Sequence, residues 1–399
     1  AMSSSCALVR ESTRRVVASS HRVKVIQRKV EQVVSEMDAG TIASVLGPKA
    51  FDGVDTHFND PNDSELTALY LLCVDAVNFC FWPDHDSVQH TKLAKKHYQQ
   101  FDVTARYLLN NGLAVEDANP AILTGTPTEN GSMSESEKWS PDTLAQQGLE
   151  YEHIAGGLKR ALVMDRACLD PSRLIQIDGA GLRELIGWPR TLPLENERAR
   201  LLREIGHGLN RHWGGKVTNL ITAALKSASN LVDLVTQTFP GFRDQTVDPR
   251  DGRQVFFFKR AQIFVGDVWG RFEGKELGDF GDTIQDLTMF ADYRVPVVLR
   301  QLGVLKYADE FAALIDRGHK IPPGSSDEID IRACTIQAVE RMRDALESRI
   351  KKEVELNVGS GEGSSPKVTS VALDWFLWTQ GEKRRDDSPP HHKTMTVFY

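Results

Sequence analysis

Cysteine is scarce in this chain. Its 399 residues include only five cysteines, and no two of them form a CxxC pair. A sparse, odd set of thiols does not fit a disulfide framework and is typical of a reducing compartment. We therefore expect a cytoplasmic protein. The five are Cys6, Cys73, Cys80, Cys168 and Cys334.

Long apolar runs and a basic excess are also missing. No stretch approaches the roughly 20 apolar residues that cross a bilayer, and the run at 255–258 is followed at once by Lys259 and Arg260. The net charge is -7, whereas proteins that bind long nucleic acids gain most of their affinity from a basic surface. We therefore expect no membrane partner and no stable nucleic-acid partner, but a small phosphorylated ligand.

Several catalytic signatures are absent too. The chain has no HExxH, no GxSxG elbow and no P-loop lysine in the glycine-rich stretch 359–366. Glu150 with His153, and Glu204 with His207, have the Glu-x-x-His spacing of di-iron bundles. Such a site needs two further inward glutamates, so ordinary polar helix faces are the preferred interpretation. We expect neither a metal nor a cofactor.

Helical periodicity dominates what the chain does contain. Apolar residues recur at i, i+3, i+4 and i+7 from residue 217 to 235, which predicts one long core helix. Similar patterns predict a helix from near residue 193 to the glycines at 214 and 215, a short helix after Asp170, and a long amphipathic helix over 327–356. Asp251 and Gly252 predict a hairpin, and residues 396–399 an edge strand. We therefore expect a mainly α fold in a single domain, with a small β-hairpin.

Polar stretches interrupt the chain without separating two patterns of structure. Residues 124–141 predict a loop insertion and residues 359–366 a second surface loop. The stretch 3–29 is rich in serine and arginine and faintly resembles an organellar transit peptide, but its valines fall at near-helical spacing. We therefore expect an N-terminal helical segment over residues 1–44, followed by one domain over 45–399.

Four short boxes place an aspartate among aromatic rings: 74–82 (VDAVNFCFW), 264–269 (FVGDVW), 289–296 (MFADYRVP) and 374–378 (DWFLW). Flat rings bind a heterocyclic base or a cation, and a poorly solvated carboxylate among them can stabilise positive charge. The sequence therefore indicates a nucleobase or nucleoside site. In the first box, Asn78 offers an amide and Phe79, Phe81 and Trp82 a stacking wall, with core packing as the alternative.

The third box gives the strongest candidate for a catalytic carboxylate. Asp292 lies between Phe290 and Tyr293, and Pro296 predicts that the aspartate lies at the start of a helix. There the helix dipole and amide groups would hold a carboxylate ionised, although a simple N-cap explains the same pattern. For Asp267 in the second box, a buried salt bridge is the preferred interpretation.

Taken in order, five motifs resemble the queuosine salvage proteins, enzymes that release queuine from queuosine 5'-phosphate. They are THFNDP with His57, NFCFW, FKRAQIFVGDVWG, MFADYRVPVVLRQLGVL and LDWFLW. The resemblance runs from about residue 45 to the C-terminus, interrupted by 124–141. It implies a largely α-helical fold similar to helix-hairpin-helix DNA glycosylases and hydrolysis of a ribosyl bond without a metal. Residues 302–305 would form the hairpin, although a glycine C-cap explains them locally.

The resemblance also implies roles for individual residues. Asp292 matches the catalytic aspartate of the family and Phe290 a ring that contacts the base, while His57 and Asp374 match residues that bind queuine. Trp375 stands where a tyrosine is common. The expected substrate-binding residues are His57, Asn78, Phe79, Phe81, Trp82, Phe290, Tyr293, Asp374, Trp375 and Thr379, the last at a position where some members carry a further ligand-binding aspartate.

The 5'-phosphate needs cationic or amide donors, for which Lys259, Arg260 and Arg294 are the candidates. Whether Asp292 forms a covalent ribosyl intermediate or stabilises the cation while water attacks stays open. Two other functions also stay open. A glycosylase acting on DNA or RNA is suggested by the hairpin-like residues 302–305 and opposed by the acidic net charge, and a non-enzymatic protein could carry queuine in the same site.

Overall fold

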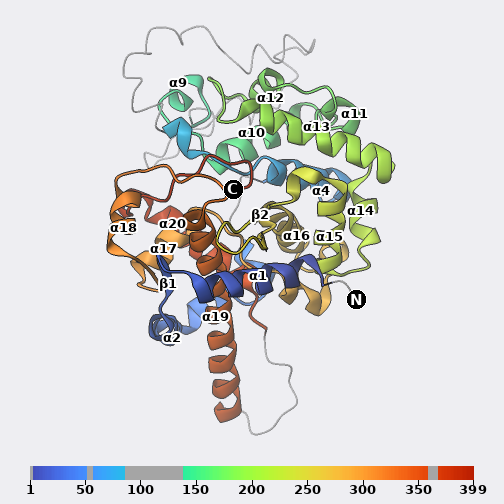
Figure 1. Cartoon of the computed structure of the whole chain (residues 1–399). Coiled ribbons are helices and arrows are strands. Elements are labelled where there is room, and N and C mark those ends of the chain that lie inside the picture. Colours follow the sequence, from blue (N-terminus) through green and yellow to red (C-terminus); the bar gives the residue numbers. More distant parts are fainter. Residues whose placement is uncertain (1–2, 52–56, 86–137, 358–366) are drawn as a thin grey trace, which may run out of the picture. The chain divides into compact units, whose positions relative to one another are not determined.

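The computed structural model describes residues 3–51, 57–85, 138–357 and 367–399. Helices predominate among these residues, together with two short two-stranded sheets, so the mainly α fold with a small hairpin is confirmed (Figure 1). The whole of the expected loop 359–366, and all but residues 138–141 of the expected insertion, lie outside the described residues. The chain forms two compact units, one of residues 1–54 and 211–399 and one of residues 55–210.

The first unit is discontinuous in sequence. Its N-terminal elements are α1 (Ser5–Ser19), β1 (Val23–Val25), α2 (Gln27–Glu36), α3 (Ala39–Ser44) and η1 (Pro48–Phe51). Its later elements are α14 (Val217–Ala223), α15 (Ala228–Thr238), η4 (Pro240–Phe242), β2 (Gln245–Val247), β3 (Gln254–Phe256), α16 (Lys259–Arg271), η5 (Glu276–Gly278), η6 (Gly281–Asp286), α17 (Val295–Gln301), β4 (Leu305–Tyr307), α18 (Asp309–Asp316), α19 (Ser326–Asn357), α20 (Ser370–Lys383) and η7 (Arg385–Asp387).

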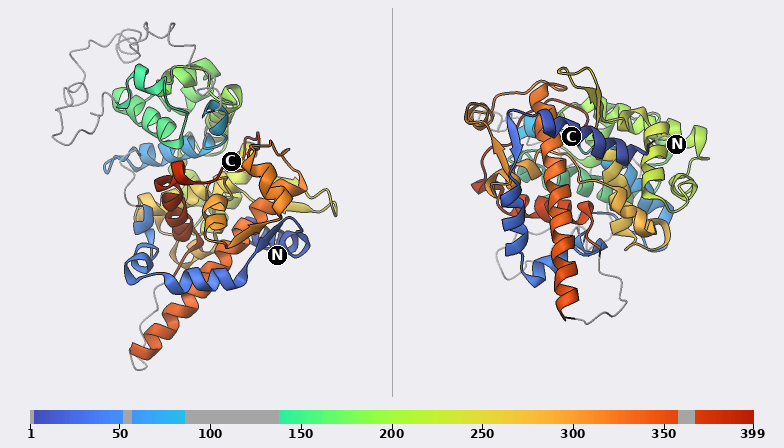
Figure 2. Two further views of the ribbon diagram at one scale, coloured as in Figure 1. Left: turned by 90° about the vertical axis from the view of Figure 1, so that its left-hand side faces the viewer. Right: turned by 60° about the horizontal axis from the view of Figure 1, so that its bottom comes forward.

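The long helix α19 is the centre of the first unit, and the prediction of a helix over 327–356 is confirmed. Every residue from 328 to 340 is buried, as expected for a helix that is covered on all sides. The elements α1, α2, β1, α17 and α20 pack against it. Figure 2 shows the blue N-terminal helices lying against the orange α19.

Two short sheets occur in the first unit. The predicted hairpin is present as β2 and β3, an antiparallel pair whose turn contains Gly252 with a φ of +69°. The second sheet was not predicted: β1 pairs antiparallel with β4, which places Val23 opposite Tyr307. The expected edge strand at 396–399 is wrong. There the N–H of Phe398 donates to Thr396 Oγ1 at 3.2 Å, which bends the chain away from an extended conformation.

The prediction of one continuous helix over 217–235 is also wrong. The chain forms α14 and α15 instead, because Leu225 and Lys226 take left-handed conformations with φ of +54° and +60°. Ser227 then caps α15 by accepting a hydrogen bond from the N–H of Asn230 at 3.3 Å. Leu225 fits the apolar periodicity, but its side chain is 81% exposed.

The second unit is a small group of helices. The predicted helix near residues 193–214 and the short helix after Asp170 are confirmed as α13 and α11. Helix α10 packs against both α4 and α12. No helix within the described parts of either unit is long and apolar enough to cross a bilayer. The elements of this unit are α4 (Ser64–Ala76), α9 (Pro141–Leu144), α10 (Tyr151–Met164), α11 (Pro171–Leu174), α12 (Gly179–Ile186) and α13 (Glu195–His212).

Candidate active site

The third box lies in a buried, irregular segment of the first unit, residues 287–294, between η6 and α17. A buried backbone that belongs to no helix or sheet needs other hydrogen-bond partners, and here side chains provide them. Gln262 of α16 accepts from the N–H of Thr288 at 2.8 Å and donates to the Thr288 hydroxyl at 2.9 Å. Two residues later, the N–H of Phe290 donates to Asp374 Oδ1 of α20 at 3.0 Å. The third and fourth boxes are therefore joined by a hydrogen bond, and helix α16, which carries the second box, binds the residue just before the third.

Asp292 lies at the start of α17, as predicted. Its Oδ1 accepts hydrogen bonds from the N–H groups of Arg294 at 3.1 Å and Val295 at 3.0 Å. These are groups that a helix leaves without an internal partner at its N-terminus. The side chain is only partly exposed, and no described residue donates a hydrogen bond to Oδ2. One oxygen is therefore anchored by the start of the helix, and the other is not.

The half-buried Asp292 and the buried Asp374 form an electrostatically linked pair of carboxyl groups. Burial raises the pKa of Asp292 above its ordinary value, opposed by Lys259, Arg294 and the amide groups at the helix start. The expected effect of the amides is therefore present, but burial outweighs it. Burial, and next the negative charge of Asp292, raise the pKa of Asp374 much further. Two amide hydrogen bonds favour the ionised form of Asp292, and one favours that of Asp374.

Aromatic rings surround the fourth box. Trp375 stacks on Trp269 of α16 with ring centroids 5.7 Å apart and an angle of 15°, and Phe51 of η1 lies 5.2 Å from the same ring. Phe290 lies so close to α16 that a Cβ atom on Gly266 would be 2.8 Å from its ring carbon Cζ. Gly266 therefore makes room for that ring. Trp375 keeps part of its surface exposed, as expected of a ring that contacts a ligand.

The neighbours of Asp292 in sequence have partners of their own. Tyr293 packs against His391, with ring centroids 4.4 Å apart. Arg294 Nε lies 2.6 Å from Glu382 Oε1 of α20. Thr379, one helical turn after Trp375 on α20, is also partly exposed. The first unit thus brings together the expected residues Phe290, Asp292, Tyr293, Arg294, Asp374, Trp375 and Thr379.

The two basic residues at the start of α16 differ. Lys259 is buried, and its charge lowers the pKa of both Asp292 and Asp374. Arg260 has no exposed surface, donates to the carbonyl of Gly241 at 2.5 Å and lies 5.0 Å from the ring of Phe242. Of the two, Lys259 is therefore the one that acts electrostatically on the carboxyl pair.

A buried ion pair between Arg332 and Asp244, which the sequence did not indicate, holds the backbone next to the site. Arg332 of α19 donates through both terminal nitrogens to Asp244, at 2.9 and 2.6 Å, and through Nε to the carbonyl of Ala291 at 3.2 Å. Asp244 Oδ2 also accepts from the N–H of Lys259 at 3.1 Å. The pair therefore fixes the backbone at Ala291, which precedes Asp292, and at Lys259, whose charge acts on Asp292. A single arginine in an amphipathic pattern gave no signal of burial.

The remaining expected residues belong to the second unit. His57 Nε2 and the hydroxyl of Tyr151 share a hydrogen bond of 2.6 Å, and the side chain of His57 is buried. This contact fixes the orientation of the imidazole. Asn78, Phe79, Phe81 and Trp82 follow α4, and the three rings are buried.

Arg198 holds the segment that carries these rings. It has no exposed surface and donates to the carbonyls of Val77, Phe79 and Cys80. Its guanidinium lies 4.3 Å from the centroid of Phe79 and 5.2 Å from that of Phe81. The alternative of core packing therefore describes Phe79 and Phe81 well. Nothing in the local sequence around Arg198 indicated this contact.

The Glu-x-x-His pairs have structural explanations. His153 Nδ1 accepts from the N–H of Glu150 at 2.8 Å in a capping box at the start of α10. Burial, followed by nearby positive charge, lowers the pKa of His153 to about 3. Glu204 forms an ion pair with Arg200 at 3.3 Å. Within the described ranges, no three His, Cys, Asp or Glu side chains are arranged to hold a metal ion.

Comparisons with known proteins point to the same family as the five sequence motifs do. Residues 56–399 match the family model described as Queuosine salvage protein. A protein named Queuosine 5'-phosphate N-glycosylase/hydrolase from Dictyostelium discoideum is 34% identical over 398 residues, which is 98% of each chain. A protein of the same name from Sphaerobacter thermophilus is 33% identical over 388 residues, 97% of this chain and 96% of its own. Another from Mus musculus is 39% identical over 210 residues, 52% of this chain and 59% of its own. Because the family model covers most of the chain and two of these relatives align with it nearly from end to end, the chain belongs to the queuosine salvage protein family.

Proposed function

We propose that this protein hydrolyses the N-glycosidic bond of queuosine 5'-phosphate and releases queuine and ribose 5-phosphate, which returns queuine to tRNA modification. The shared name of its relatives supports the substrate and the reaction class. The observation that carries the proposal is the environment of Asp292, a half-buried carboxylate with one oxygen anchored by two amide groups.

The chemistry explains why such a carboxylate is needed. The bond between the ribose C1' and the base nitrogen breaks, water supplies the new C1'–O bond, and a proton from that water ends on the base. Positive charge builds on the sugar before the water bond is complete. Queuine is a 7-deazaguanine, so it has no N7 that an acid could protonate. Stabilisation of the sugar cation must therefore supply more of the rate enhancement, and we assign this role to Asp292.

Contacts to the base follow from the same geometry. We assign stacking to Phe290, Tyr293 and Trp375, and the cationic side-chain amine of queuine to Asp374. A bound ammonium group would favour ionisation of this carboxyl, which in the ligand-free protein holds its proton strongly. Thr379 shares a helical face with Trp375 and would contact the cyclopentene diol.

The residues of the second unit are assigned from the family motif that they match. We assign queuine binding to His57, whose orientation is fixed by Tyr151, and a supporting role to the residues of the NFCFW motif: Asn78, Phe79, Phe81 and Trp82. The proposal for His57 rests on the resemblance and on its buried hydrogen bond.

For the 5'-phosphate we favour Lys259 among the three basic candidates. Its charge acts on Asp292, which is where a nucleotide would have its sugar. Arg260 is directed to the carbonyl of Gly241 and the ring of Phe242, and the charge of Arg294, which also acts on Asp292, is shared with Glu382.

We extend the proposal to the finer fold and the setting. A helix-hairpin-helix arrangement would consist of α17, the turn at Gly303 and α18. It is supported by the glycine-dependent end of α17, where Gly303 has a φ of +72° and the N–H of Val304 donates to the Leu299 carbonyl at 2.9 Å. A cytoplasmic location and the lack of a stable nucleic-acid partner are supported by the sparse cysteines and the net charge of -7.

The test is to incubate the protein with queuosine, its 5'-phosphate and its 3'-phosphate and to measure released queuine by mass spectrometry. Release from the 5'-phosphate, with much less from the other two, is expected. Asp292→Asn keeps an acceptor for the amides of Arg294 and Val295 but removes the charge. A carboxylate about 4 Å from the cation contributes roughly 4 kcal/mol at an effective dielectric near 20, so kcat should fall about 10³-fold.

Asp309→Asn is the matched control, because Asp309 is an exposed aspartate in the first turn of α18. It should behave as the unchanged protein does. Full turnover by Asp292→Asn would show that Asp292 has no catalytic role. If the protein binds queuine stoichiometrically and produces no ribose 5-phosphate, it is a queuine carrier and not an enzyme.

A further inference from the structure

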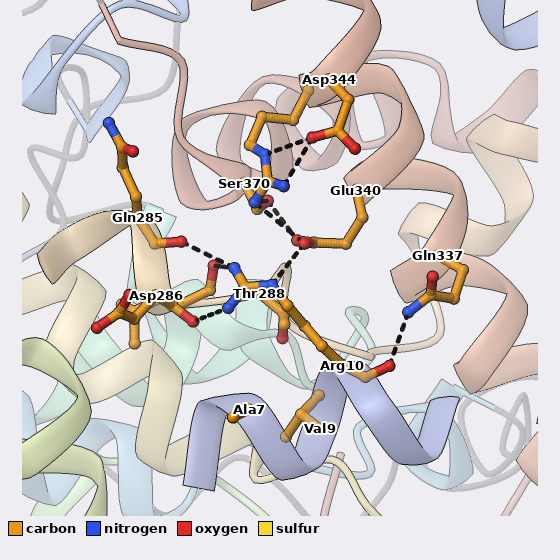
Figure 3. Close-up of polar contacts among 12 residues, drawn as sticks. Ala7, Val9, Arg10, Gln285, Asp286, Thr288, Gln337, Glu340, Asp344 and Ser370 are labelled. Atoms are coloured by element: carbon orange, nitrogen blue, oxygen red, sulfur yellow. Dashed lines mark hydrogen bonds and ion pairs between the residues drawn. The ribbon is translucent and has the colours of Figure 1, made fainter. Parts of the chain in front are cut away.

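Arg10 of the N-terminal helix α1 binds the backbone that leads into the candidate active site. Its Nη1 donates to the carbonyl of Asp286 at 2.5 Å, and its Nη2 donates to the carbonyls of Gln285 at 2.8 Å and Leu287 at 3.0 Å. Figure 3 shows the guanidinium reaching from α1 to this stretch of chain. Three successive carbonyls at the end of η6 are thus held by one side chain, just before the 287–294 segment.

The fourth contact of Arg10, with Glu340, connects it to the helix that carries Asp374. Arg10 Nε lies 2.7 Å from Glu340 Oε2 of α19, and the hydroxyl of Ser370 donates to Glu340 Oε1 at 2.6 Å. Glu340 therefore links the N-terminal helix to the first residue of α20, and its Oε2 is shared with Arg343 of α19 at 3.0 Å. Asp374 lies one helical turn further along α20.

The position of α1 itself is fixed by α19. Gln337 Nε2 donates to the carbonyl of Arg10 at 3.3 Å and to the hydroxyl of Thr13 at 2.9 Å. Both contacts come from the helix that also carries Glu340, one turn away. The guanidinium therefore has little freedom to shift along the chain it binds.

These contacts connect the two parts of the site that carry its carboxyl groups. One path runs from Arg10 through the 285–287 carbonyls to the segment that ends in Asp292. The other runs through Glu340 and Ser370 to the helix that carries Asp374. The separation of Asp292 and Asp374 depends on the relative position of these two elements. They are also joined directly, by the 3.0 Å bond from the Phe290 N–H to Asp374 and by the ion pair of Arg294 with Glu382 at 2.6 Å.

We propose that Arg10 is a positioning residue of the active site, which fixes the Asp292 segment relative to helix α20. The inference rests on the proposed function, since it needs a reaction to be measured. It assigns a role to a helix that precedes the part of the chain matched by the family model, residues 56–399. Arg10 touches no substrate in this role and acts through the backbone and through Glu340.

The experiment compares Arg10→Ala and Arg10→Lys with Arg14→Ala, a change of an exposed arginine on the same helix. Steady-state kinetics with queuosine 5'-phosphate are measured well below the melting temperature of each variant. Arg10→Ala should lower kcat roughly 10- to 100-fold, because small displacements of a catalytic group have effects of that size. KM should change much less, and Arg14→Ala should match the unchanged protein. Arg10→Lys should recover only part of kcat, since an ammonium cannot bind three carbonyls and a carboxylate in the same geometry.

Chemical rescue separates positioning from a general loss of stability. The side chain of Arg10 is 20% exposed, so a small guanidinium compound can reach the space that Arg10→Ala leaves. Millimolar methylguanidinium should raise kcat of Arg10→Ala several-fold and leave Arg14→Ala and Asp292→Asn unchanged. A residue that only stabilises the fold would show an altered melting temperature, an unchanged kcat and no rescue.

The outcomes distinguish this inference from the proposed function. If the unchanged protein releases no queuine, the proposed function fails. If it is active and Arg10→Ala has the kcat of Arg14→Ala, the role of Arg10 is refuted. If Arg10→Ala does not fold, Ser370→Ala decides, because it removes the hydroxyl that links Glu340 to α20, together with a 3.5 Å bond from Arg343, and leaves the contacts of Arg10 in place. A lower kcat at an unchanged melting temperature supports positioning, and an unchanged kcat overturns it.

Discussion

Replacing Arg332 by methionine removes the cation from its buried ion pair with Asp244, which holds the segment that carries Asp292. Both side chains of the Arg332–Asp244 pair are 2% exposed. The guanidinium lies between the rings of Phe257 and Tyr399, with its carbon 4.0 and 4.3 Å from their centroids. Methionine fills much of the same space between the rings, so the substitution tests the charge and the hydrogen bonds more than the packing.

The expected cost is large. Removing one partner of a buried ion pair leaves the other charge uncompensated and costs about 3–5 kcal/mol. The carbonyl of Ala291 also loses its donor from Arg332, although the two effects are not independent. Against a total stability of about 5–15 kcal/mol, this loss is a substantial fraction. Asp244→Asn keeps an acceptor for the N–H of Lys259 and removes the orphaned charge, so adding it to Arg332→Met should restore about 2 kcal/mol.

Urea unfolding of the two single variants and the double variant gives these free energies as a double-mutant cycle. Lys352→Met is the control, because Lys352 is an exposed cation on the same helix α19. It should change the unfolding free energy by less than about 0.5 kcal/mol. A loss below about 1 kcal/mol for Arg332→Met, or strictly additive effects in the double variant, would refute the reasoning about the buried pair.

Two further predictions concern the site itself. Because burial and the charge of Asp292 raise the pKa of Asp374, the folded state loses stability as pH rises from the ordinary aspartate range through the raised pKa. Asp374→Asn removes this loss and can still accept a hydrogen bond from the Phe290 N–H. The melting temperature of the variant minus that of the unchanged protein should therefore increase as the pH rises from about 4 to 8. A difference that does not depend on pH would contradict the raised pKa. Gly266→Ala places a methyl group 2.8 Å from Phe290 Cζ, so it should cost about 1–3 kcal/mol and lower kcat/KM by displacing that ring. Gly40→Ala, whose new methyl would be 3.4 Å from its nearest neighbour, is the control, and equal behaviour of the two variants would show that Phe290 moves without cost.

Local patterns predicted much of the helical structure. The helix over 327–356, the short helix after Asp170 and the hairpin at Gly252 each depend on residues close together in sequence. The break between α14 and α15 was missed because apolar periodicity continues through Leu225, while the left-handed conformations at Leu225 and Lys226 leave no mark in that pattern. The pairing of β1 with β4 joins Val23 to Tyr307, a separation that no short window contains.

The same limit applies to the site. The sequence identified Asp292 at a helix start from its neighbour Pro296, and its two amide bonds follow from that location. It did not indicate that Arg332 and Asp244 meet, because they are 88 residues apart and each looks like an ordinary surface charge. Their burial is a property of the packed helices around α19. The roles of the individual site residues stay predictions until the variants are measured.

The discontinuous first unit has a consequence for biosynthesis. During translation α1 leaves the ribosome well before its partners, because Arg10 binds carbonyls 275–277 residues later in the chain. The second unit, residues 55–210, emerges as one uninterrupted stretch in the meantime. The newly made α1 must therefore keep its apolar face protected until η6 and α19 have been synthesised, a period in which exposed hydrophobic surface invites chaperone binding or aggregation. Helix α1 thus waits for partners that are made long after it.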